Sequence, residues 1–99
     1  MNRYKLTIEY LGSNFCGWQR QKNSITVQEV LETAAKNFFQ HNVVLFAAGR
    51  TDAGVHAEGQ VAHLDTENKY DSERVLYGIN FFLDKEVMGK DIRVKKFLK

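Results

Sequence analysis

Residues 3–10, RYKLTIEY, alternate strictly between apolar and polar side chains, and this alternation constrains the fold more than any other feature of the chain. The apolar positions are Tyr4, Leu6, Ile8 and Tyr10, and the polar positions are Arg3, Lys5, Thr7 and Glu9. A period of two places the apolar set on one face of an extended segment. We therefore predict a β-strand with one buried and one solvent-facing side.

Two segments show the apolar spacing of amphipathic helices. Thr26 followed by Glu29 is a capping-box pattern, and it predicts a helix over residues 26–40 that His41 and Asn42 end. A second helix is expected to start at Asp71–Ser72. The predicted buried positions are Val27, Val30, Leu31, Ala34 and Phe38 in the first helix, and Val75, Leu76, Ile79, Phe82 and Leu83 in the second.

Three further segments predict strands. Residues 43–48, VVLFAA, are apolar on both faces, which is typical of a strand covered on both sides or lying at an interface. Residues 60–65 predict a short strand, and residues 91–97, after a turn at Gly89, predict the last one. In that last strand Ile92 and Val94 are expected to point inward, and Arg93 and Lys95 outward.

The resulting order is strand, helix, strand, strand, helix, strand. A chain of 99 residues in this order predicts one α+β domain over residues 1–99, with a ferredoxin-like or RRM-like βαββαβ fold. Its four-stranded antiparallel sheet would carry two helices on one face, with the first and last strands adjacent. The helix-free face would then gather Arg3, Lys5, Arg93 and Lys95.

Charge and composition narrow the function classes. The net charge is only +2, but the two ends are basic and the middle is acidic, so a positive surface could meet phosphates; solvated surface lysines are the alternative. Hydrophobic residues at 43% exclude an intrinsically disordered chain. No apolar run is long enough to span a membrane, and the single cysteine, Cys16, excludes an internal disulfide. We expect a cytoplasmic protein without a membrane partner.

The segment GRTDAGVHAEG, residues 49–59, is the densest candidate site. Arg50 and Asp52 flank Thr51, so in extended backbone both side chains point to the same side. A nearby guanidinium lowers the pKa of a carboxyl group and keeps it ionised, ready to act as a nucleophile or an acceptor. The alternative is a loop tied together by an Arg–Asp bridge.

Two other candidates are weaker. The spacing of Asp52, His56, Glu58 and His63 fits no established metal-ligand pattern, so no metal site is predicted. No basic partner is indicated beside Cys16, which argues against a catalytic thiol.

Residues 11–22 form a predicted loop with aromatic, amide and cationic side chains. Trp18, Gln19 and Arg20 suit contact with nucleic acid by stacking, hydrogen bonding and phosphate neutralisation. Alternatively, Phe15 and Trp18 anchor the loop to the core, and Arg20 is solvated without a partner.

The nine residues GRTDAGVHA, 49–57, resemble the catalytic signature of the TruA family of tRNA pseudouridine synthases. Further matches run along the whole chain, but only to the N-terminal half of the family's members. They are Tyr10, Gly12, Phe15, Gly17, Trp18 and Gln19; Thr26, Val27, Gln28, Leu31 and Glu32; Gln60, Val61 and Ala62; and Asn80, Asp91 and Ile92.

The resemblance implies isomerisation of uridine to pseudouridine at uridines 38 to 40 of the tRNA anticodon stem-loop, without a cofactor or metal. Asp52 matches the essential aspartate, which attacks the uracil ring or the ribose C1′. Arg50 matches the arginine that pairs with it and helps to hold the nucleotide out of the stack. The expected substrate- or RNA-contacting residues are Thr51, Gly54, His56, Trp18, Gln19, Arg20, Arg3 and Lys5.

The chain also departs from the family pattern. Leu11 stands where the family usually has an aspartate, Glu58 replaces a commonly apolar residue, and the chain has no proline. Family members have a second domain that completes the cleft, and the full-length enzyme is expected to be a homodimer that binds the anticodon stem-loop. We therefore expect this chain to be the N-terminal catalytic half, inactive or nearly so alone, with an exposed surface near Val44 and Phe46 that favours self-association.

Two other functional classes are alternatives to a tRNA pseudouridine synthase. A non-catalytic RNA-binding βαββαβ module would stack bases on aromatics of its central strands. The solvent-facing positions of the first strand and the whole third strand lack such aromatics. A small-ligand regulatory domain would leave residues 11–22 and the Arg50–Asp52 pair without a role.

Overall fold

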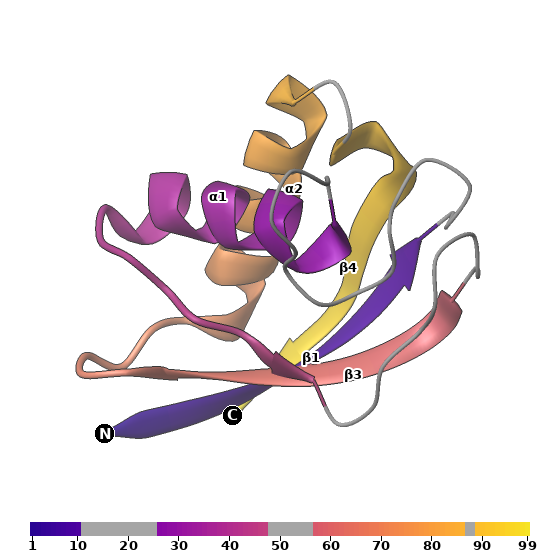
Figure 1. The fold of residues 1–99 in the computed structure, drawn as a ribbon. Helices are drawn as coiled ribbons and strands as arrows, with labels where there is room; N and C mark the ends of the chain where they lie inside the picture. Colours follow the sequence, from indigo (N-terminus) through magenta and orange to yellow (C-terminus); the bar gives the residue numbers. More distant parts are fainter. Residues whose placement is uncertain (11–25, 48–56, 87–88) are drawn as a thin grey trace.

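The computed structural model describes residues 1–10, 26–47, 57–86 and 89–99. A four-stranded antiparallel sheet, in the order β2-β3-β1-β4, carries two helices on one face (Figure 1). The elements are β1 (Asn2–Tyr10), α1 (Val27–Phe39), β2 (Phe46–Ala47), β3 (Ala57–Thr66), α2 (Ser72–Lys85), a 3-10 turn (Gly89–Asp91) and β4 (Ile92–Leu98). The predicted βαββαβ fold and the pairing of the first and last strands are confirmed.

Strand β1 is the centre of the sheet. It is hydrogen-bonded to β3 on one side and to β4 on the other. Its alternating apolar residues are all buried under the helices, as the period of two predicts; they are Tyr4, Leu6, Ile8 and Tyr10. A strand with two partners and one covered face satisfies both its backbone and its apolar side chains.

Helix α1 begins as its capping box predicts. The Thr26 hydroxyl accepts a hydrogen bond from the Glu29 amide at 3.3 Å. The helix ends at Phe39, because Gln40 adopts the left-handed conformation with φ 66°, so the predicted end at His41 is slightly late. Of the predicted buried stripe only Phe38 differs: it is half-buried, and Phe39 takes the buried position.

Helix α2 starts where Asp71 accepts a hydrogen bond from the Arg74 amide at 3.3 Å. Val75, Ile79 and Leu83 are buried, as predicted, and two other predicted residues are half-buried; these are Leu76 and Phe82. The side-chain amide of Asn80 donates to the Val94 carbonyl at 3.0 Å and accepts from the Val94 amide at 2.9 Å. The helix thus supplies hydrogen-bond partners to the edge strand β4, which would otherwise expose them.

Three predicted boundaries or faces are wrong in detail. Within residues 43–47 only Phe46–Ala47 pairs as a strand, although the sequence predicts a strand from residue 43. Val44 and Phe46 are 56% and 51% exposed, so the predicted exposed surface near these two residues is confirmed and the segment is not covered on both sides. Strand β3 begins at Ala57, inside the predicted loop 49–59. The Arg93 side chain bonds to Asp84 and, at 3.4 Å, to the Asn80 carbonyl, so its charge lies toward α2 rather than on the helix-free face.

Glu86, at the end of α2, is a carboxylate in an unfavourable place. Within the described part of the chain its Oε2 atom is buried without a hydrogen-bond partner, and desolvation raises its pKa above the usual range. Because desolvation disfavours the ionised form of Glu86 in the folded state, the ionised carboxylate destabilises the fold at neutral pH. This penalty disappears below the unfolded-state pKa, at about 4.3.

We therefore expect Glu86→Gln to raise the thermal midpoint at pH 7 and to have almost no effect near pH 4. The matched control is Glu67→Gln, which changes an exposed carboxylate in the turn after β3. Thermal unfolding followed by circular dichroism at both pH values measures the difference. An equal effect of Glu86→Gln at pH 7 and pH 4 would contradict the desolvation argument.

Candidate functional site

The two segments that carry the catalytic and RNA-contact predictions join the sheet at one end. Tyr10, which precedes residues 11–25, is the register partner of Ala57, which follows residues 48–56. Tyr10 is also the partner of Ile92 across the β1–β4 pair. Residues more than forty positions apart in the sequence are therefore neighbours at this end of the sheet, where a site built from both segments would be assembled.

Most of the predicted site residues lie outside the described residues. These are Asp52, Arg50, Thr51, Gly54, His56, Trp18, Gln19 and Arg20. Arg3 and Lys5 are described, and both side chains are exposed on the helix-free face of β1. The roles proposed for all of these residues stay predictions.

Helix α1 holds the segment that leads into the signature. The buried Glu32 carboxylate accepts a hydrogen bond from the Leu45 amide at 2.7 Å, and the Gln28 side-chain amide donates to the Leu45 carbonyl at 3.1 Å. Gln28 also donates to Glu32 at 3.1 Å. Both backbone groups of Leu45 are thus bound by α1, which orients the chain just before β2.

The same kind of contact explains part of the sequence resemblance. Gln28, Glu32 and Asn80 are among the residues that match the family pattern. Gln28 and Glu32 bind the backbone of Leu45, and Asn80 binds the backbone of Val94 on β4. Their spacing within the helices does not reveal this, because the backbone groups that they contact lie 13 to 17 positions away.

Ion pairs neutralise much of the predicted basic face. The Arg3 guanidinium donates two hydrogen bonds to Asp65, at 2.9 and 3.1 Å, which raises the pKa of Arg3 and holds the pKa of the Asp65 carboxyl below its usual range. The Lys95 ammonium lies 3.5 Å from Glu9. Within the described residues Lys5, Lys96 and Lys99 have no ion-pair partner, so they leave open positive charge on this face.

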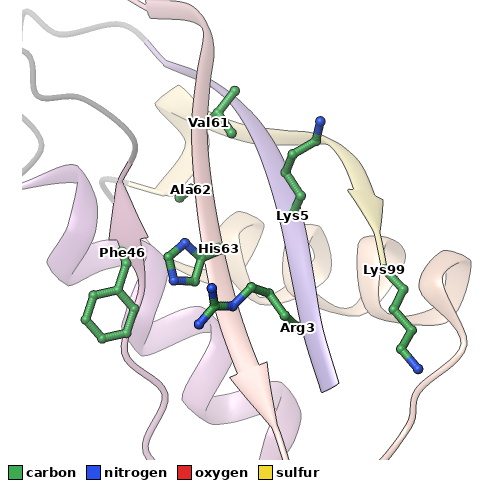
Figure 2. A pocket seen from close by; sticks show the side chains of 7 residues that line it. All are labelled: Arg3, Lys5, Phe46, Val61, Ala62, His63 and Lys99. Carbon is green, nitrogen blue, oxygen red and sulfur yellow. The ribbon is translucent and has the colours of Figure 1, made fainter. Parts of the chain in front are cut away.

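A hollow on the helix-free face lies between these charges and β2. Figure 2 shows the Phe46 ring beside the His63 imidazole, with the Arg3 guanidinium next to them. The two rings stack with centroids 5.2 Å apart and planes 22° apart. The residues that line the hollow are Arg3, Lys5, Phe46, Val61, Ala62, His63 and Lys99.

The sequence did not predict this grouping. The sequence places Phe46 in an apolar segment and near an exposed surface, and it offers His63 only as part of a weak metal candidate. The signal that could have found it is the strand register, which pairs Phe46 with His63 and His63 with Lys5. That register depends on the length of the connections and cannot be read from the alternation of each strand alone.

Among the side chains that the structure describes, no three His, Cys, Asp or Glu residues gather as metal ligands. Asp52 and His56 of the weak metal candidate, and the side chain of Glu58, lie outside the description. No helix in the described ranges has the length and hydrophobicity needed to cross a membrane.

The chain is similar in sequence to known proteins over most of its length. The sequence profile described as tRNA pseudouridine synthase matches residues 6–96. The chain is 55% identical over 82 residues to "tRNA pseudouridine synthase A" of Ehrlichia chaffeensis and 52% identical over 82 residues to the protein of that name from Wolbachia pipientis wMel. Each alignment covers 82% of this chain and 34% of the relative, so the chain spans about a third of the length of these curated relatives.

Proposed function

Because the chain belongs to the tRNA pseudouridine synthase family, we propose that residues 1–99 form the nucleophile-bearing domain of an enzyme that isomerises uridine to pseudouridine in tRNA. The observation that carries the proposal is the family match over residues 6–96 together with the unbroken signature GRTDAGVHA at 49–57. The proposed substrates are uridines 38 to 40 of the anticodon stem-loop.

In the proposed reaction Asp52 is the nucleophile. Its carboxylate attacks the uracil ring or the ribose C1′, the N1–C1′ bond breaks, and the detached uracil turns. A C5–C1′ bond then forms and the bond between Asp52 and the nucleoside breaks, which regenerates the free carboxylate. The C5 proton is lost and N1 gains a proton. The product is an isomer of the substrate, so no oxidant, reductant or second substrate is consumed.

Arg50 is proposed to serve the same step in two ways. Its guanidinium favours the ionised form of Asp52, which is the form that can attack. Its planar fork also suits the phosphate of a nucleotide extruded from the stack, and a base inside a helix must be extruded before a carboxylate can reach it. The hydrogen bonds that Leu45 accepts from Gln28 and donates to Glu32 support this arrangement, because they orient the chain five residues before Arg50.

The relatives are about three times as long as the stretch that they share with this chain. We propose that a second domain of the kind found in the family completes the cleft, that the full-length enzyme is a cytoplasmic homodimer, and that residues 1–99 alone are inactive or nearly so. These statements concern the whole enzyme and are tested together with its activity.

A chimera provides the test. This chain replaces the matching stretch of the Wolbachia relative, and unmodified tRNA is assayed for pseudouridine with the chimera, the parent relative and the 99-residue chain. We expect the chimera to modify the tRNA, and a tRNA with cytidines at positions 38 to 40 to remain unmodified. A chimera that folds and binds tRNA without modifying it would contradict the proposed activity and favour the non-catalytic RNA-binding module. Multiple turnovers by the 99-residue chain would contradict its predicted inactivity.

A further inference from the structure

A transverse row of side chains crosses the helix-free face of the sheet. Phe46 on β2 is the register partner of His63 on β3, His63 is the partner of Lys5 on β1, and Lys5 is the partner of Leu98 on β4. Adjacent strands lie about 4.8 Å apart, so the row spans roughly 14 Å. Its members come from all four strands and face the side without helices.

The row offers an aromatic platform at one end. Phe46 remains 51% exposed although one side of its ring lies against His63, so much of the ring is open to a ligand. Val61 and Ala62 also line the hollow, Val61 further along β3 from the rings (Figure 2), so part of its lining is apolar. Such a surface matches the flat face of a nucleobase, which stacks on aromatic side chains whatever its sequence.

Cations border the same hollow. Lys5 and Lys99 line it, and within the described residues neither has an ion-pair partner. Two acidic side chains that the structure describes on this face are already engaged, Asp65 by Arg3 and Glu9 by Lys95. A ligand that combines a flat apolar ring with a negative charge therefore fits the hollow, whereas a second copy of the chain would bring two further unpaired ammonium groups against these two.

We propose that this hollow binds one unpaired nucleotide of RNA, with its base stacked on the Phe46–His63 pair and its phosphate contacted by Lys5 and Lys99. The proposal rests on the proposed function for the choice of RNA as the ligand. It adds a binding subsite on the helix-free face of the sheet, formed by residues other than Arg50 and Asp52.

The test uses the 99-residue chain and a fluorescently labelled hexauridylate, with binding followed by fluorescence anisotropy. Phe46→Leu removes the ring and keeps an apolar side chain, and we expect it to weaken binding by about five- to a hundredfold. The matched control is Phe81→Leu on α2, which removes a ring that is 54% exposed on the helix side, and this variant is expected to bind like the parent chain.

The phosphate contacts have their own readout. Replacing both Lys5 and Lys99 by glutamine is expected to reduce the slope of log affinity against log salt by about 1.4, because each contact to a single strand contributes about 0.7. Lys36→Gln, which removes an exposed cation on α1, is the control and should leave the slope unchanged. Circular dichroism confirms that each variant is folded.

Three results would overturn the proposal. In the first, Phe46→Leu binds the oligonucleotide as tightly as the parent chain. In the second, Phe46→Leu and Phe81→Leu weaken binding equally. In the third, the parent chain does not bind the oligonucleotide but forms a concentration-dependent dimer that Phe46→Leu disrupts. Because pseudouridine formation by the chimera is measured separately, the subsite and the proposed function fail independently. If the chimera modifies tRNA and Phe46→Leu binds the oligonucleotide normally, only the subsite is refuted. If binding depends on Phe46 and the chimera is inactive, only the proposed function is refuted.

Discussion

Replacing Asp52 by alanine in the chimera is expected to lower the rate of pseudouridine formation by at least about a thousandfold. The proposed reaction requires a carboxylate that forms a covalent bond with the nucleoside, and alanine provides no group that can replace it. Binding of tRNA should remain close to that of the unchanged chimera, because Asp52 contributes a negative charge rather than a phosphate contact. Single-turnover assays of pseudouridine formation and filter binding of the same tRNA measure the two effects.

Arg50→Lys is the companion variant. Lysine keeps the positive charge but loses the planar, two-pronged geometry, so we expect an intermediate loss of rate. If Asp52→Ala keeps nearly full activity and only lowers the thermal midpoint, the carboxylate ties its own loop together and is not the nucleophile. The parent relative assayed beside the chimera shows whether a loss of rate comes from the substitution or from the joining of the two sequences.

Replacing Tyr4 by alanine is expected to lower the free energy of unfolding by about 3–5 kcal/mol. Tyr4 is fully buried in the central strand, and its ring stacks on Phe97 with centroids 4.7 Å apart. Its hydroxyl donates to the Tyr70 carbonyl at 3.1 Å and accepts from the Tyr70 amide at 2.8 Å. A domain of this size is stable by about 5–15 kcal/mol, so the loss would consume much of its stability.

Tyr4→Phe separates the ring from the hydroxyl. It keeps the packing against Phe97 and leaves both backbone groups of Tyr70 without this partner, so we expect a smaller loss of about 1–3 kcal/mol. Urea unfolding of the two variants and the parent chain measures these differences. Equal losses in Tyr4→Phe and Tyr4→Ala would mean that the hydroxyl, and not the buried ring, stabilises the strand.

Local patterns predicted the fold well. The alternation of residues 3–10 identified the central strand and its buried face, and Thr26 and Asp71 identified the starts of both helices. These signals are local because a strand face, a helix stripe and an N-cap depend on residues within a few positions of one another. The order of the elements then restricted the topology to a sheet in which β1 and β4 are neighbours.

Local patterns failed where distant residues compete for one side chain. Arg93 was expected on the helix-free face, but Asp84 and the Asn80 carbonyl of α2 bind its guanidinium. For the apolar run 43–48 the sequence leaves open a strand covered on both sides or one at an interface, because coverage depends on which elements pack over it. In the structure Val44 and Phe46 are exposed. Its strand is short in the described residues, since α1 binds the backbone of Leu45 in place of a neighbouring strand.

The candidate site also has a part that the sequence predicts and a part that it does not. The residue types and spacing of Arg50 and Asp52 lie within one short segment, so their chemistry could be inferred from the order of amino acids alone. The grouping of Phe46, His63 and Lys5 on the helix-free face could not be inferred in this way. Its members are 17 to 58 positions apart and meet only through the register of three strands. That register is set by the packing of the whole sheet against both helices, which is why the open face could be assigned only once the chain was folded.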